Sequence, residues 1–239
     1  MIKVSHMINL IDNGFGVFNH EVVELLLNFV EDSYRQIGIE SAKSVFVCHT
    51  TEEPMCCVIS DGNLHCIKLN TEGDYWCQWV YQFAHEYCHH LIDGSLSGEW
   101  SDMLWFEETI CELSSLYNLN RMIKFCMMNG LQGYAPSVDE YLRNLLTKNK
   151  DTCCLYADGG CYKQYEDSLR VKQYQRDLYN AIAVMMYPLF MENPRLWKMI
   201  MNIGDIRLWS SLDDLFTHLE ANADDSYRDS LRRLRQMFS

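Results

Sequence analysis

Apolar side chains recur at helical spacing over residues 20–37, with Glu and Asp on the remaining face. This pattern predicts an amphipathic helix that ends at Gly38. Three short segments rich in β-branched or apolar residues follow, at residues 44–48, 56–60 and 64–69. An Asp-Gly-Asn turn joins the last two, and Asp-Gly tolerates the positive φ that a tight hairpin requires. The sequence therefore predicts a small antiparallel sheet after the first helix.

From Thr71 onward, almost every segment has the apolar spacing of a helix. Gly94 and Gly130 are expected to follow the ends of two helices, because glycine readily adopts the left-handed conformation found there. Further helices are expected to start at Ser137, Asn193 and Ser211, from two capping boxes and a proline at the first helical position.

These elements indicate an α+β fold in which a small antiparallel sheet and an N-terminal helix pack on a mostly helical remainder. No linker rich in Pro or Ser divides the chain, and no internal repeat is visible. We therefore interpret residues 1–239 as one domain, with a sheet part over 1–70 and a helical part over 71–239.

The charge and the apolar runs of the chain limit its partners. Thirty-three acidic and twenty basic residues give a net charge of −13, which disfavours binding to a nucleic-acid backbone. The longest apolar run, Ala181 to Met191, has eleven residues and contains Pro188, whereas a membrane span needs about twenty. The N-terminal residues lack the pattern of an export signal. We expect a cytoplasmic protein with neither a nucleic-acid nor a membrane partner; its oligomeric state is left open.

Eleven cysteines are present, but no Cys-x-x-Cys pair occurs among them. A four-cysteine zinc ribbon and a thioredoxin motif are therefore excluded. The count is odd and there is no export signal, so we interpret the cysteines as reduced thiols that serve as small buried apolar side chains.

The segment with the clearest chemistry is His85-Glu86-Tyr87-Cys88-His89, which lies within a stretch of helical apolar spacing. Residues four apart lie on one face of a helix, so the imidazoles of His85 and His89 can reach a single metal ion. Glu86, one position further on, can then contact a water bound to that ion. Two histidines and a water leave zinc one ligand short.

A downstream carboxylate is the expected third ligand. Eighteen residues separate His89 from Glu108, and Glu112 follows Glu108 at the same helical spacing. Both glutamates align with an apolar stripe, and carboxylates on a buried face need partners. Glu107 aligns instead with a more polar face, so we favour Glu108 over its neighbour.

Over the thirty residues or so from His85 to Glu112, the sequence resembles the gluzincin zinc metallopeptidases. The resemblance implies a zincin-like helical part and one Zn²⁺ ion held by His85, His89 and Glu108. It also implies that Glu86 acts as general base and that Glu112 orients His85. Gluzincins commonly have an edge strand before the active helix along which an extended peptide lies, and residues 64–70 occupy that place here.

Other interpretations of the same residues remain. Outside His85 to Glu112 no further family motif is recognised, and a metzincin is excluded because Ile92 and Ser95 occupy its required Gly and ligand positions. An aspzincin site that uses Asp93 or Asp102 is an alternative. So is a histidine cluster that packs without metal.

The expected activity is zinc-dependent hydrolysis of peptide bonds in a peptide or protein substrate. Glu86 would take a proton from the attacking water and pass it to the leaving amine. A tyrosine often stabilises the oxyanion in such sites, and among three tyrosines in the helical stretch 173–191 we favour Tyr179. The alternative is a non-proteolytic sensor or interaction protein that binds zinc on the same scaffold.

Overall fold

The computed structural model describes residues 8–59, 64–93, 101–148, 161–171 and 175–239. The strands are β1 (Ile8–Leu10), β2 (Ser44–His49), β3 (Met55–Ile59) and β4 (Leu64–Leu69). The α-helices are α1 (His20–Arg35), α2 (Trp76–Ile92), α3 (Leu104–Met128), α4 (Ala135–Lys148), α6 (Cys161–Val171), α7 (Arg176–Glu192), α8 (Leu212–Asn222) and α9 (Arg228–Gln236). Short 3-10 helices are η1 (Gln132–Tyr134), η2 (Pro194–Asn202) and η3 (Ile206–Leu208).

The expected α+β class is confirmed, but the sheet is mixed and not antiparallel. Its strand order is β1-β2-β4-β3, with β1-β2 and β2-β4 parallel and only β3-β4 antiparallel. The helix α1 connects β1 to β2, which lets these strands run parallel, as crossover connections do. The predicted turn at residues 61–63 lies outside the described residues.

The prediction that residues 64–70 form an edge strand is wrong. β4 lies inside the sheet between β2 and β3, and β3 takes the edge. The chain folds back from β3 into β4, and β4 then pairs with β2, so β3 is left on the outside. This order could not be deduced from the strand sequences, because each of them has the same apolar character.

The helix boundaries follow local capping chemistry in most places. The side chain of Asn19 accepts a hydrogen bond from the Val22 backbone at the start of α1, and Ser211 caps α8 through the Asp214 backbone. Asn193 caps η2, as expected, although that helix is of the 3-10 type. The predicted start at Ser137 is wrong because α4 already begins at Ala135.

The predicted glycine signals have different outcomes. Gly130 follows α3 with a φ of +77°, as expected, whereas Gly94 lies outside the described residues. α2 instead ends on Asp93 in the left-handed conformation, with a φ of 55°. The first helix ends at Arg35, three residues before Gly38.

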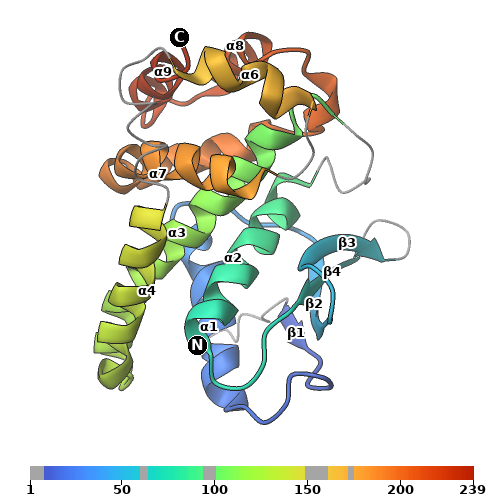
Figure 1. Cartoon of the computed structure of the whole chain (residues 1–239), viewed down its shortest axis with the longest axis vertical. Coiled ribbons are helices and arrows are strands. Elements are labelled where there is room, and N and C mark those ends of the chain that lie inside the picture. The colour runs from blue at the N-terminus through green and yellow to red at the C-terminus, as the bar shows by residue number, and fades with distance from the viewer. Residues whose placement is uncertain (1–7, 60–63, 94–100, 149–160, 172–174) are drawn as a thin grey trace.

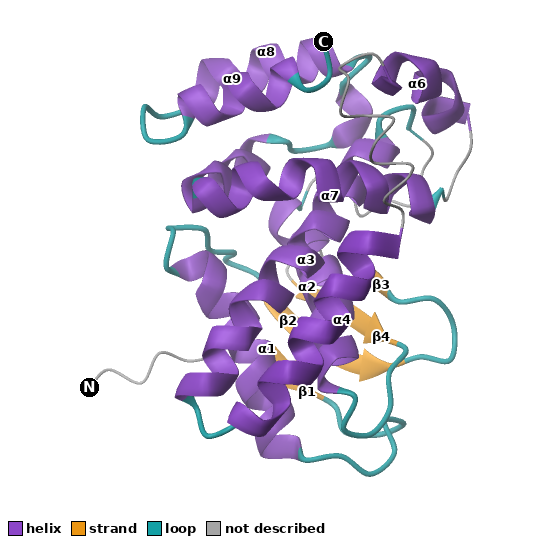
Figure 2. Cartoon of the chain, turned by 60° about the vertical axis from the view of Figure 1, so that its left-hand side comes forward, coloured by secondary structure: helices purple, strands orange, loops and turns teal. Residues whose placement is uncertain are grey.

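In Figure 1 the strands lie on one side of α2 and α3, while α6, α8 and α9 form the top of the molecule, above α7. A second view shows α1 and α4 in front of the strands (Figure 2). The helix α2 contacts β4, α1 and α3, so it lies at the centre of these layers. None of the described helices combines the length and the apolar character needed to cross a bilayer.

A buried histidine pair joins α2 to the sheet. His65 on β4 and His90 on α2 are 0% and 1% exposed, and their Nδ1 atoms lie 2.8 Å apart. One of these nitrogens must donate to the other, so the geometry fits two neutral rings. The Lys43 ammonium lies 3.4 Å from the second nitrogen of His65 and 2.5 Å from the Asp93 carboxylate. Burial, followed by the neighbouring His65 and Lys43, lowers the pKa of His90 to about 3.

This pair predicts a loss of stability at mildly acidic pH. As the pH falls below about 6.5, His90 takes up a proton in the unfolded chain but not in the folded protein. The free energy of unfolding should then fall by about 1.4 kcal/mol for each pH unit on account of His90. His90→Asn keeps a hydrogen-bonding group but cannot titrate, so its stability should depend less on pH. Urea unfolding of both proteins between pH 7 and 5 measures this, and identical slopes would exclude a neutral pair.

Candidate metal centre

The site is built on two helices held together by buried hydroxyl groups. Ser114 on α3 donates a 2.6 Å hydrogen bond to the Ala84 carbonyl of α2, and Ser115 donates one of 2.7 Å to the Tyr81 carbonyl. Serine is small, so the backbones approach closely, and each hydroxyl is satisfied although it is buried. This packing brings the N-terminal half of α3 against the His85–His89 turn of α2.

The predicted ligand residues lie together. The Nε2 atom of His85 is 3.3 Å from Oε2 of Glu108, and Nε2 of His89 is 3.6 Å from Oε1 of the same carboxylate. The two imidazole centroids are 5.2 Å apart. Each imidazole therefore turns its Nε2 atom toward one oxygen of the Glu108 carboxylate, between α2 and α3.

The other nitrogen of each imidazole faces a second carboxylate. His85 Nδ1 lies 3.8 Å from Glu112, the residue predicted to orient it. The carboxylate of Glu112 accepts hydrogen bonds of 2.8 and 2.7 Å from the Tyr81 hydroxyl and one of 2.8 Å from Asn180. These contacts fix Glu112 in place. Metal-ligating histidines usually donate their second N–H to such an acceptor, which leaves Nε2 free to bind the ion.

Glu107 is a site residue that the sequence analysis missed. Its carboxylate accepts a 2.7 Å hydrogen bond from Nδ1 of His89, and Glu107 is only 1% exposed. Its helical face carries polar residues, as the sequence indicates, but α3 is covered on that side too, so these polar groups are buried. The sequence offered one indication of this role. Each metal-ligating histidine usually donates its second N–H to an acceptor, so His89 was expected to need a carboxylate of its own, as His85 has in Glu112.

The electrostatics of the centre favour positive charge at the imidazoles. Burial lowers the pKa of His89, but the hydrogen bond to Glu107 and the charges of Glu108 and Glu107 outweigh burial and raise it to about 10. The pKa of His85 is also raised, since the hydrogen bond to Glu108 and the nearby carboxylates outweigh burial. Burial raises the pKa of Glu108, yet the two imidazoles outweigh it and lower the value to about 2.

Glu86 lies beside this cluster in a buried position, 5% exposed. Burial is the largest cause of its raised pKa, and the charge of Glu108 adds to it, while the imidazoles and a backbone hydrogen bond from Cys56 on β3 oppose the rise. A carboxylate with a raised pKa takes up a proton more readily near neutral pH than an ordinary one does.

His85, His89 and Cys111 form a candidate metal-binding group, because each offers a ligand atom within 4.8 Å of the others. Cys111 was predicted to serve in packing, and it is fully buried on α3. Burial is the main cause that raises the pKa of its thiol well above the ordinary value, followed by contact with Cys88. Thiolates and not thiols bind metal ions, so this environment disfavours Cys111 relative to the ionised Glu108.

A cavity of about 340 Å³ opens onto the centre. Its walls include Tyr81, His85, Glu86, Glu108, Glu112, Tyr179 and Asn180. Tyr179 comes from α7 and is 5% exposed, so the residue favoured for oxyanion stabilisation lines the same cavity as Glu86. Its catalytic role stays a prediction.

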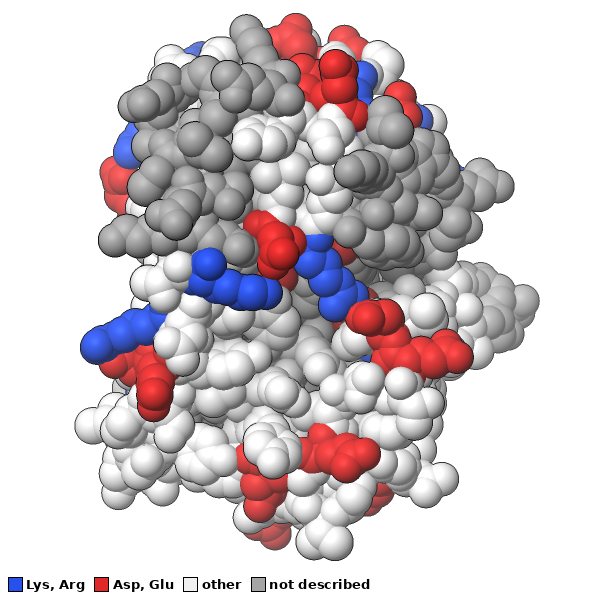
Figure 3. Space-filling view, viewed as in Figure 1, with Lys and Arg blue, Asp and Glu red and all other residues white. Residues whose placement is uncertain are grey.

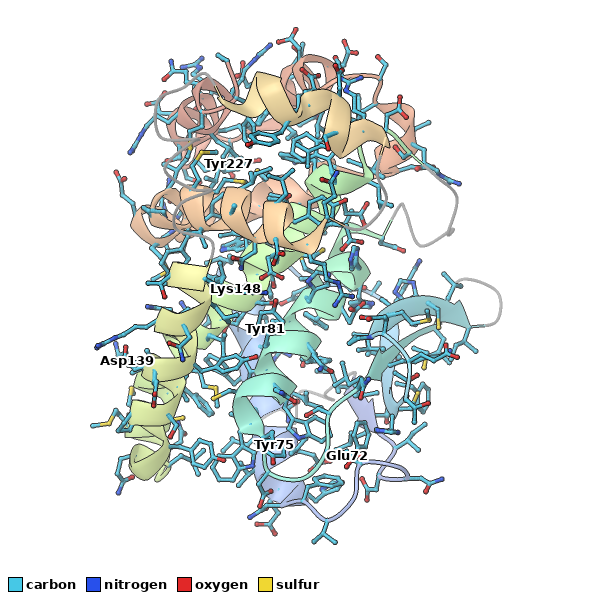
Figure 4. The ribbon with its side chains drawn as sticks, in the orientation of Figure 1. Glu72, Tyr75, Tyr81, Asp139, Lys148 and Tyr227 are labelled. Carbon is cyan, nitrogen blue, oxygen red and sulfur yellow. The ribbon has the colours of Figure 1, made fainter. Side chains whose placement is uncertain are left out.

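Two ion pairs lie at the wall of this cavity. Arg176 at the start of α7 is 2.5 Å from Glu53 in the β2–β3 connection, and Lys148 at the end of α4 is 3.1 Å from Asp177. The space-filling view shows basic and acidic side chains gathered across the middle of this face (Figure 3). The stick view places Tyr81 on α2 just below Lys148 (Figure 4). The charge of Arg176 also helps to lower the pKa of Glu108.

Asp93, a ligand in the alternative aspzincin interpretation, has other partners. Its carboxylate lies 2.5 Å from Lys43 and 3.5 Å from His65, at the C-terminal end of α2.

A scan against protein-family models, a search of curated proteins and a search of solved structures each found no match to this chain. The geometry of the centre is therefore the basis for a functional assignment.

Replacing Glu107 tests its contact with His89. Glu107→Gln keeps an acceptor near Nδ1 but removes the charge, so it should weaken the binding of a metal ion at this centre by about 10–100-fold, as loss of the outer partners of metal ligands does. Competition with a chromophoric chelator measures the affinity. Glu140→Gln on the exposed face of α4 is the matched control and should leave the metal affinity as it is in the wild type. Equal affinities for both variants would show that Glu107 does not orient a ligand.

Proposed function

We propose that the protein is a zinc-dependent peptide hydrolase with one Zn²⁺ ion held by His85, His89 and Glu108. The observation that carries the proposal is the approach of both Nε2 atoms to the Glu108 carboxylate, at 3.3 and 3.6 Å. Imidazole nitrogens and a carboxylate oxygen are a donor set that suits zinc, and three protein ligands are typical of a catalytic zinc site. The resemblance to gluzincins supports the same ligand set.

The residues around the proposed ion suit hydrolysis. When bound, zinc polarises a carbonyl and lowers the pKa of a coordinated water to about 7. Glu86 accepts a proton from the attacking water and then passes it to the leaving amine, and its raised pKa favours this task. The hydroxyl of Tyr179 donates to the oxyanion from the α7 side of the cavity. Glu107 and Glu112 hold the two imidazoles in their orientation.

The substrate in this proposal is a peptide or protein in an extended conformation. β3 stands at the end of the strand order, and Met55, Val58 and Ile59 on it are exposed apolar residues. An extended peptide can add to such an edge through backbone hydrogen bonds. The cavity wall includes Glu53 and Pro54, directly before β3, so a peptide paired with this strand leads into the cavity.

The second proposal is a zinc-binding protein without proteolytic activity, such as a sensor or interaction domain. The donor set alone serves this function equally well. The buried Glu86 favours the enzyme, since a site that only binds metal gains nothing from a carboxylate with a raised pKa at this position.

Glu86→Gln separates the two functions. The substitution preserves shape but removes the base, so hydrolysis of a mixed peptide library should fall by about 10²–10⁴-fold while the bound zinc is retained. Mass spectrometry of the cleaved peptides and metal analysis of both proteins measure this. Absence of cleavage by the zinc-loaded wild type would favour the non-proteolytic function, and activity retained by Glu86→Gln would contradict the role of this base.

A pair of substitutions identifies the third ligand. Glu108→Ala should weaken zinc binding by more than about 100-fold, since it removes a ligand and not only an outer partner. Cys111→Ala should leave the affinity close to that of the wild type, because the buried thiol is protonated. Chelator competition measures both, and circular dichroism establishes that both variants are folded. The reverse order of affinities would assign Cys111 as the ligand in place of Glu108.

A further inference from the structure

Three cysteines lie on the face of the sheet turned away from the buried strand positions. Val47 and Ile67 point into the core, and side chains alternate along a strand, so Cys48 on β2 and Cys66 on β4 point to the opposite face. Cys57 on the edge strand β3 pairs in register with Cys66 and shares that face. None of these three thiols belongs to the proposed metal centre.

Two of these thiols are close enough to react with each other. The Sγ atoms of Cys48 and Cys66 are 3.4 Å apart on neighbouring strands. A disulfide requires about 2.05 Å, so an approach of about 1.4 Å closes the bond. The Sγ atom of Cys57 faces the backbone of β4 and not a second thiol, since it donates to the carbonyl oxygen of Cys66 at 3.5 Å.

The two thiols differ in access to solvent. Cys48 is partly exposed, whereas Cys66 is 6% exposed. Burial is the largest cause that raises the pKa of Cys66 to about 12, and its contact with Cys48 adds to the rise. Cys66 therefore stays a thiol at neutral pH, and an oxidant in solution meets Cys48 first.

We propose that Cys48 and Cys66 form a redox-active dithiol that hydroperoxides oxidise to an intramolecular disulfide. The thiolate of Cys48 attacks one oxygen of hydrogen peroxide, the O–O bond breaks, and a sulfenic acid forms with release of hydroxide. The sulfur of Cys66 then attacks the sulfur of Cys48 as its proton is lost, and the S–O bond breaks. Two thiols lose two electrons in total, and one hydrogen peroxide is reduced to two molecules of water.

Among the other described cysteines, burial keeps four thiols from ionising readily. Cys88, Cys111 and Cys126 are buried, and burial is the largest cause that raises the pKa of Cys111, of Cys126 and of the half-buried Cys77, the last to about 11. Cys56 points to the core face of the sheet, where burial and the charge of Glu86 raise its pKa well above the ordinary value. Cys56, Cys77, Cys111 and Cys126 therefore have little thiolate character near neutral pH.

The experiment titrates the reduced full chain with hydrogen peroxide and then blocks the free thiols with N-ethylmaleimide. The number of blocked cysteines should fall by two from the eleven in the chain, and dithiothreitol should restore it. Cleavage after Glu52 and before Asp61 places Cys48, the Cys56–Cys57 pair and Cys66 in three separate peptides. Mass spectrometry should find the peptides of Cys48 and Cys66 linked.

Matched variants assign the order of the steps. Cys66→Ala should accumulate the sulfenic acid at Cys48, which dimedone traps, and Cys48→Ser should form neither the adduct nor the link. Cys57→Ser is the control and should form the disulfide as the wild type does. A link that involves Cys57, a link between two chains, or oxidation of Cys48 to a sulfinic acid without any link would each overturn the proposal. The wild-type peptide map decides the outcome even if a variant fails to fold.

Discussion

The structure of the site depends on the close packing of α2 against α3. Two serine hydroxyls of α3 bind carbonyl groups of α2, at Ala84 and Tyr81, and these lie within one helical turn of His85. Such contacts satisfy buried polar groups without separating the helices. A larger residue at either serine would push α3 outward, and the Glu108 carboxylate would no longer lie between the two imidazoles.

Once the helices are packed, the carboxylates determine the charge state of the centre. Glu86, Glu107, Glu108 and Glu112 surround two histidines. Burial opposes a rise in the pKa of His89, but Glu107, Glu108 and Glu86 outweigh it and raise that pKa to about 10. The imidazoles thus hold protons strongly where no ion is bound. Exchange of two protons for one divalent cation leaves the total charge unchanged, so the same carboxylates that favour imidazolium also favour a metal ion.

The sheet places cysteines on both of its faces, and the two groups have different surroundings. The side chain of Cys56 points toward the core, where the charge of Glu86 helps to raise its pKa, after burial. Cys48, Cys57 and Cys66 point to the opposite face. The alternation of a strand is enough to place Cys56 and its neighbour Cys57 in different surroundings. The mixed order of the strands then brings Cys48 next to Cys66, which are distant in the sequence.

Local patterns in the sequence determined several features of the protein. The spacing of His85 and His89 places both imidazoles on one helical face, and the same spacing aligns Glu108 with Glu112, because helical geometry depends only on neighbouring residues. The caps at Asn193 and Ser211 were predictable for the same reason. Only the tertiary structure decided the strand order, the contact of Glu107 with His89, the place of Tyr179 in the cavity wall and the proximity of Cys48 to Cys66. These depend on how separate elements pack, and segments of similar apolar character do not encode in their own sequence which neighbour they will have.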